Sequence, residues 1–102
     1  MTGIKILPLH RGTVLFEEYI IPMHLTEKRI AEDIHVPVWR INDIIAGKRS
    51  ITAETALRLG RYFGTPAHFW FGLQMDYDLK MALNNEGLNI ERDIEAYDDS
   101  RR

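Results

Sequence analysis

The most restrictive feature of this sequence is a very short connection between two helical segments. Thr26 is a suitable N-cap for the first segment, whose apolar residues recur at helical spacing. Pro37 suits the first position of the second segment, because its missing N–H would have no intrahelical partner there. Only about two residues, His35 and Val36, separate the segments, which is too few for a relaxed antiparallel hairpin and suits a sharp crossing. The sequence therefore predicts a helix-turn-helix at about 26–46.

Helical spacing continues along most of the chain, which predicts an all-α domain of five helices. Pro22 ends the first helix, Thr52 caps the fourth, and Gly64 can adopt the left-handed conformation that ends it. In the fourth helix we expect Ala56, Leu57, Gly60 and Phe63 to face inward. The polar residues after Leu83 predict a short acidic C-terminal tail, about 84–102, with one or two amphipathic turns. The expected helices span about 12–21, 26–35, 37–46, 52–63 and 66–83.

Length and composition limit the class of protein. A chain of 102 residues is long enough for one compact domain, residues 1–102, and hardly for two. No apolar run approaches the roughly 20 residues that cross a bilayer, and the first residues lack the cleavage site of a secretory signal. The sequence has no cysteine, which excludes disulfides and Cys-ligated zinc. We therefore expect a cytoplasmic protein without a membrane partner.

The second helix of the predicted helix-turn-helix has an apolar face and an outward face. If Ile41, Ile44 and Ile45 point to the core, the side chains at 38–40, 42 and 43 point away from it. In such a motif the outward face meets base edges in the major groove of DNA. The basic residues after the helix are placed to hold phosphates, which set register and give salt-dependent affinity. The candidate DNA contacts in this part of the chain are Val38, Trp39, Arg40, Asn42, Asp43, Lys48, Arg49 and Ser50.

Arg40 is the residue expected to read sequence most directly. Its planar guanidinium can donate to both acceptors of a guanine, whereas Asn42 can pair with an adenine or contact a phosphate if it rotates outward. Asp43 would repel phosphates unless it accepts from a cytosine or orients Arg40. The net charge of −2 is not typical of a DNA-binding domain, although residues 26–61 are basic and the residues from 76 onward are acidic. The spacing alone leaves open that these cations are ordinary solvated charges.

The fifth predicted helix carries apolar side chains around its whole circumference. A surface helix needs only one apolar stripe, so a second surface has to cover the remainder. A second subunit could do this, and a twofold dimer would place two recognition helices roughly 34 Å apart, one turn of DNA. The alternative is a central core helix that the other helices and the tail surround. The candidate dimerisation residues are Phe69, Trp70, Leu73 and Tyr77.

Catalysis has little support in the sequence. The four histidines are scattered and form no pair at i, i+4, so a metal site would need ligands from unrelated elements. Asp76 and Asp78 lie two apart on a helix and diverge, which does not suit paired acid–base chemistry. We expect no enzyme activity, no cofactor, no metal and no small-molecule ligand. A small enzyme or ligand-binding helical domain is the most distant hypothesis.

A series of short motifs in residues 10–82 goes beyond these periodicities. After VP come RIN, GKR, ITAETALRL, RYFGT, FW, LQ and DYDL, in this order. In these motifs the sequence resembles the HigA-type antitoxins of bacterial type II toxin–antitoxin systems, which belong to the Cro/phage-repressor helix-turn-helix class. The resemblance implies a homodimer that binds operator DNA, represses its own operon and neutralises a co-encoded, mRNA-cleaving HigB-type toxin. A stand-alone phage-type transcriptional regulator without a toxin partner is the alternative.

The start of the first helix departs from the pattern of that family. The family often has Pro-Gly-Glu where this chain has Arg11, Gly12 and Thr13, and often an arginine where it has Phe16. Phe16 either packs under the N-terminal arm or is an exposed contact for a partner. Two surfaces are therefore candidates for the toxin: the first helix with Phe16, and the acidic tail from Glu86, which could meet a basic RNA-cleaving partner.

The start of the helix-turn-helix departs from the pattern as well. Many repressors of this class bond a phosphate through a glutamine near this point, but here the residue after the cap is Glu27. A carboxylate cannot donate that hydrogen bond. We expect Thr26, Lys28 or Arg29 to hold the phosphate instead.

Overall fold

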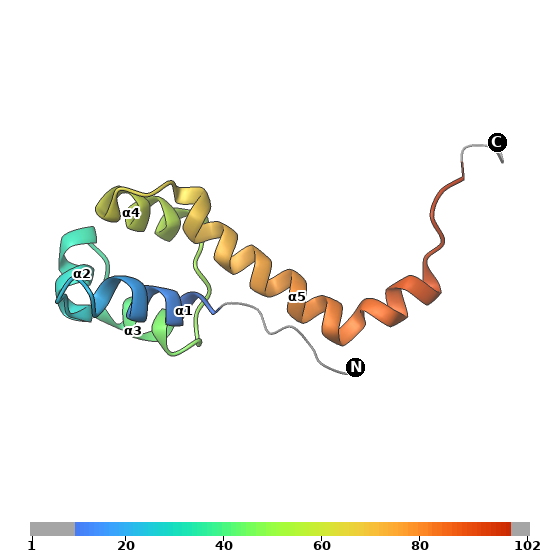
Figure 1. Cartoon of the computed structure of the whole chain (residues 1–102), viewed down its shortest axis with the longest axis horizontal. Helices are drawn as coiled ribbons and strands as arrows, with labels where there is room; N and C mark the ends of the chain where they lie inside the picture. The colour runs from blue at the N-terminus through green and yellow to red at the C-terminus, as the bar shows by residue number, and fades with distance from the viewer. Residues whose placement is uncertain (1–9, 99–102) are drawn as a thin grey trace.

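Every regular element within residues 10–98, the part of the chain that the computed structural model describes, is a helix. The elements before the last helix lie together, and the last helix leaves this group and extends away from it (Figure 1). The predicted all-α class is confirmed for these residues. In chain order the elements are α1 (Arg11–Thr13), the π-helix η1 (Val14–Ile20), α2 (Glu27–Ile34), α3 (Val38–Ile45), α4 (Ala53–Phe63) and α5 (Ala67–Asp93).

The turn between α2 and α3 is as tight as the sequence predicts. Thr26 caps α2, because its hydroxyl accepts a hydrogen bond from the backbone N–H of Arg29 at 3.0 Å. His35 ends α2 in the left-handed conformation, with φ 62° and ψ 46°. The N–H of Val36 then donates to the carbonyl of Ala31 at 3.0 Å, which closes the end of the helix. The chain direction therefore changes within this turn, and α3 starts at once.

The core is formed by η1, the helix-turn-helix, α4 and the start of α5. The Trp70 ring of α5 is fully buried and contacts Tyr19 and Phe63 at centroid distances of 4.9 and 5.7 Å. Gly12 lets the first helix approach α3 closely, because a Cβ there would lie 2.4 Å from the carbonyl oxygen of Ile45. The buried apolar residues are Val14, Leu15, Ile20, Ile30, Ala31, Ile34, Val36, Ile41, Ile44, Ile51, Ala56, Leu59 and Trp70.

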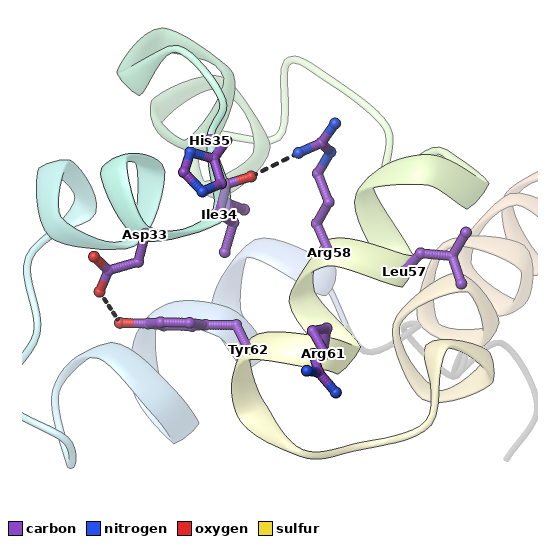
Figure 2. Close-up of a pocket in the computed structure, with 7 residues that line it drawn as sticks. All are labelled: Asp33, Ile34, His35, Leu57, Arg58, Arg61 and Tyr62. Carbon is purple, nitrogen blue, oxygen red and sulfur yellow. Dashed lines mark hydrogen bonds between the residues drawn. The ribbon is translucent and has the colours of Figure 1, made fainter.

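Helix α4 is joined to the C-terminal end of α2 by two hydrogen bonds. Asp33 accepts from the Tyr62 hydroxyl at 2.6 Å, and Arg58 donates to the carbonyl of Ile34 at 2.8 Å (Figure 2). The second bond satisfies a carbonyl that has no partner within α2. Hydrogen bonds from Tyr62 and then from Arg29 lower the pKa of Asp33, and the bond to Asp33 raises the pKa of Tyr62. These contacts fix the helix-turn-helix on α4. The residues that make them line an open groove of about 300 Å³.

One expected core position in α4 is wrong. Leu57 was expected to face inward, but its side chain is 64% exposed. The inward face of α4 centres on Leu59, and Leu57 lies roughly 160° away from it around the helix. The Leu57 side chain instead borders the groove of Figure 2 and a second, apolar pocket of about 230 Å³ between α4 and α5.

The expected C-terminal tail is largely helical, so that prediction is wrong for residues 84–93. Helix α5 continues through the polar segment and ends at Asp93, and residues 94–98 have no regular secondary structure. Extending a formed helix costs far less than nucleating a new one, so polar residues and even Gly87 can continue it. The last part of the predicted tail, residues 99–102, lies outside the described residues, as do residues 1–9 of the N-terminal arm.

Candidate nucleic-acid interface

The first turn of α3 presents an exposed surface. Val38 and Trp39 are 43% and 48% exposed. The guanidinium of Arg49 lies over the Trp39 ring, 4.5 Å from its centroid, where cation–π attraction is favourable. The structure therefore brings the start of α3 and the loop after it onto one face. Such a face combines apolar groups, which can contact a thymine methyl, with a cation for a phosphate.

Arg40 has a partner on α4. Its Nη1 lies 3.5 Å from Oε1 of Glu54, and its side chain is 26% exposed. The alternative in which Asp43 orients Arg40 is wrong, because Asp43 is paired with Arg49 at 4.0 Å. Each of the two arginines on this face thus lies near a carboxylate in the free protein, and Arg40 shares Glu54 with Arg58, whose Nη2 lies 2.9 Å from Oε2.

Asn42 is directed toward α2. Its amide nitrogen donates a hydrogen bond to the carboxylate of Glu27, which joins the middle of α3 to the start of α2. Asn42 would have to leave this carboxylate before it could meet an adenine or a phosphate. Glu27 therefore has a structural partner in Asn42.

The candidate phosphate contacts lie at the start of α2 and in the loop after α3. The loop backbone is ordered by the carbonyl of Asp43, which accepts from the N–H groups of Lys48 and Arg49 at 2.8 and 3.2 Å. The Thr26 hydroxyl accepts the capping bond and still has a proton that can be donated to a phosphate. The exposed candidates of this kind are Thr26, Lys28, Lys48, Arg49 and Ser50.

Sequence reasoning missed one residue of this region, Arg11. Its side chain is 4% exposed, and its guanidinium donates hydrogen bonds to the carbonyl oxygens of Arg49 and Gly47. The signal was visible, since Arg11 stands where the similar antitoxins often have a proline. A departure from a pattern does not by itself reveal which atoms the new side chain meets, and here the acceptors lie more than 30 residues further along the chain.

The prediction that Trp70 belongs to a dimer interface is wrong. Its side chain is 0% exposed within one subunit, and its indole N–H donates to the Thr65 hydroxyl at 2.8 Å. Leu73 is partly buried against the same core. Tyr77 lies edge-on to His10, with ring centroids 5.4 Å apart. These three candidates therefore lie on the face of α5 that meets its own domain, while Phe69, the fourth, is 38% exposed.

The other face of α5 carries an exposed apolar stripe. Its members recur every four residues, so they lie along one side of the helix. Their exposed fractions rise from 40% at Phe71 to 68% at Leu83, as α5 leaves the domain. We call the set Phe71, Met75, Leu79 and Leu83 the α5 stripe.

Two other kinds of site are not found among residues 10–98. No group of three or more His, Asp or Glu side chains there is arranged to hold a metal ion. No helix in this part of the chain is long and apolar enough to cross a membrane.

Comparison with known proteins identifies the family. The family model described as helix-turn-helix matches residues 16–70. Virulence-associated protein I of Dichelobacter nodosus is 48% identical over 83 residues, which cover 80% of this chain and 77% of that protein. An addiction module antidote protein of a HigA family from Coxiella burnetii is 41% identical, with a TM-score of 0.85 over 90% of this chain and 100% of that one. Pseudomonas aeruginosa antitoxin HigA, solved with the higBA promoter, is 39% identical, with a TM-score of 0.83 over 86% and 96% of the two chains. The chain therefore belongs to the helix-turn-helix family and, within it, to the HigA-type antitoxins.

Proposed function

We propose that this protein binds operator DNA through α3, represses its own operon and neutralises a co-encoded, mRNA-cleaving HigB-type toxin. The observation that carries the DNA-binding proposal is the exposed first turn of α3, where Val38 and Trp39 stand beside the cations of the following loop. The similar Pseudomonas aeruginosa HigA, whose structure was solved with the higBA promoter, supports the same conclusion.

In the proposed complex α3 lies in the major groove, with its first turn toward the bases. Arg40 then exchanges the Glu54 carboxylate for the two acceptors of a guanine. The exchange is favourable because an exposed ion pair contributes only about 0–1 kcal/mol, whereas a bidentate base contact provides about 1–3 kcal/mol of discrimination. Val38 and Trp39 are the groups that can pack against thymine methyls.

Phosphates flank this contact on both sides in the proposal. Lys48, Arg49 and Ser50 hold one strand, and Thr26 and Lys28 hold the other end of the motif. Of the alternatives at the start of α2, Arg29 is the least suited, because its Nε is paired with Asp33 at 2.7 Å. The net charge of −2 does not oppose this arrangement, since the acidic residues are concentrated on distal α5 and beyond.

The dimer is formed through the α5 stripe in this proposal. Antiparallel pairing about Leu79 would bring Met75 of each subunit against Leu83 of the other and would cover all of these exposed side chains. Such a pair is twofold symmetric, and it would therefore match the twofold symmetry of two operator half-sites. Phe69 does not belong to this stripe, because its ring packs against Tyr19 and Trp70 of its own domain, with centroids 6.4 and 5.0 Å away.

Two surfaces are open to the toxin. Phe16 of η1 is 37% exposed, beside the exposed Glu17 and Glu18. The second surface is the end of α5, where Glu86 and Glu91 are exposed. We favour the end of α5, because acidic side chains that project from the domain suit a basic, RNA-binding partner.

The proposed function is tested in two steps. Titration of promoter DNA should show salt-dependent binding, and absence of binding would contradict the operator role. Co-expression with the product of an adjacent short reading frame, followed by pull-down, should recover a complex. Without such a frame the protein would be a stand-alone regulator.

The toxin surface is tested with two matched double variants. Glu86→Gln with Glu91→Gln should weaken toxin binding by about three- to tenfold at low salt, because it removes two charges from the end of α5. Glu17→Gln with Glu18→Gln makes the same charge change beside Phe16 and should leave toxin binding unchanged. The reverse pattern would place the toxin on η1, and both variants should keep operator binding.

A further inference from the structure

We propose that Arg11 is a positioning residue for DNA binding, which holds the loop of residues 47–50 in the shape that presents its cations to phosphates. The proposal rests on the operator-binding function above. Arg11 itself is 4% exposed and cannot touch DNA, so it would act through the loop.

The guanidinium of Arg11 meets the carbonyl side of this loop. Its Nε and Nη2 donate to the carbonyl oxygen of Arg49 at 3.1 and 3.0 Å, and Nη2 also lies 3.4 Å from the carbonyl oxygen of Gly47. The opposite side of the loop is held by α3, because the N–H groups of Lys48 and Arg49 both donate to the carbonyl of Asp43. The loop backbone is thus fixed from two sides.

This arrangement has a direct consequence for an anion. Carbonyl oxygens carry partial negative charge and would repel a phosphate if they faced it. Arg11 draws the carbonyls of Gly47 and Arg49 inward, and the side chains of Lys48 and Arg49 are exposed. The buried positive charge also adds to the local field that a phosphate meets. A rigid loop loses less conformational entropy on binding than a mobile one.

The same guanidinium contacts α5. Its Cζ lies 5.2 Å from the centroid of the Tyr77 ring, within the range of cation–π attraction. Arg11 therefore connects the loop after the recognition helix to the helix that we propose as the dimer interface.

A lysine could not reproduce these contacts. A planar guanidinium donates in several fixed directions and presents a face to an aromatic ring at the same time, whereas an ammonium is a single point charge.

The test measures coupling between Arg11 and the loop cations. Arg11→Met should weaken operator and non-operator DNA alike by about tenfold and reduce the slope of log affinity against log salt by about one to two. In the Arg11→Met background, Lys48→Ala should cost much less than it does in the wild type, because the loop no longer presents Lys48. Lys28→Ala on α2 is the matched control, and its cost should be the same in both backgrounds.

The outcomes separate the inference from the proposed function. Wild-type protein that does not bind operator DNA contradicts the function itself. If the wild type binds operator DNA, either of two results overturns the inference alone. One is an Arg11→Met variant with unchanged DNA affinity and salt slope. The other is a Lys48→Ala variant that loses as much affinity in the Arg11→Met background as in the wild type. If Arg11→Met does not fold, the same coupling is measured with Arg11→Lys, which keeps the charge and loses the planar donor geometry and is expected to show the same loss.

Discussion

Arg40 has two possible partners, Glu54 in the free protein and a base in the proposed complex. The 3.5 Å contact with Glu54 holds the guanidinium at the edge of the DNA-facing surface. Water solvates the Glu54 carboxylate, which is 59% exposed, so the ion pair with Arg40 is easily broken. The side chain is thus kept in place without being withdrawn from recognition.

Replacement of Arg40 tests the base contact directly. Arg40→Ala should cost about 1–3 kcal/mol of operator binding and relax specificity at one base pair. Lys48→Ala should instead weaken all sequences alike and lower the salt slope by about one. Electrophoretic shifts with operator and scrambled DNA at several salt concentrations measure both effects. Unchanged operator affinity of Arg40→Ala would mean that α3 does not enter the groove as proposed.

His10 gives the start of the first helix a dependence on pH. Its Nδ1 accepts from the N–H of Gly12 at 2.9 Å, so the ring caps the helix only when it is neutral. Burial, and then the charge of Arg11, lower the pKa of His10 from its ordinary value of 6.5. The unfolded chain therefore takes up this proton more readily than the folded one. The stability that neutral His10 provides is present above pH 6.5 and is lost as the pH falls through the lowered pKa.

The variant His10→Asn removes this titration and keeps a side-chain acceptor for the cap. We expect the melting temperature of the wild type to fall more than that of His10→Asn between about pH 7.5 and about pH 5. Thermal unfolding followed by circular dichroism at a series of pH values measures the difference. Parallel curves for the two proteins would show that His10 contributes nothing to the acid sensitivity.

At the scale of the elements, the turn between α2 and α3 stores backbone strain. His35 adopts φ 62°, a conformation that is unfavourable for a residue with a Cβ, although histidine visits it more often than most. Gly64 adopts a similar φ of 71° at the end of α4, with open space around it. One turn therefore carries the strain and the other avoids it.

Exchanging the residue types at these two turns isolates the backbone effect. His35→Gly should stabilise the protein by about 0.5–1 kcal/mol, the difference between relief of strain and the greater flexibility of glycine in the unfolded chain. Gly64→Ala should destabilise it by about 1 kcal/mol without any steric clash. Chemical denaturation with matched slopes measures both free energies of unfolding. A destabilised His35→Gly would show that the imidazole makes contacts that outweigh the strain.

The sequence allowed the helix-turn-helix to be placed within one or two residues, because caps and turns depend on local chemistry. Thr26 as a cap and the inward Ile41 and Ile44 follow from residue type and spacing alone. The orientation of α5 could not be predicted in this way. Its apolar residues surround the helix, and only the contact with the domain decides that Trp70 is buried and Leu79 exposed. Contacts between distant segments, such as Arg11 with the loop, are equally invisible to a local pattern.

At the scale of the whole molecule, α5 is too long for the domain that it leaves. The radius of gyration is 17.8 Å, whereas a compact chain of this length has about 13 Å. The principal extents of 57, 36 and 21 Å reflect the projecting helix that Figure 1 shows. A helix that projects with Leu79 and Leu83 exposed at 65% and 68% leaves apolar surface in water, and a second subunit would remove it.

The proposed dimer is tested with two leucines of the same helix. Leu79→Lys, in the middle of the α5 stripe, should convert the dimer to a monomer, because it would bury two ammonium groups about the twofold axis. Leu88→Lys makes the same change at a residue that is 80% exposed. Leu88 lies nine positions after Leu79 and therefore on roughly the opposite face of the helix, so this variant should leave the dimer intact. Sedimentation at micromolar concentration measures the association state of each protein.

Loss of the dimer should also be visible in DNA binding. A monomer contacts one half-site, so Leu79→Lys should bind a full operator much more weakly and lose the preference for correctly spaced half-sites. Binding to a single half-site should be unchanged, because α3 and its loop lie on the domain and not on the projecting part of α5. A wild-type monomer in sedimentation would contradict the proposed dimer, and a Leu79→Lys variant that remains a dimer would place the subunit contact outside the α5 stripe.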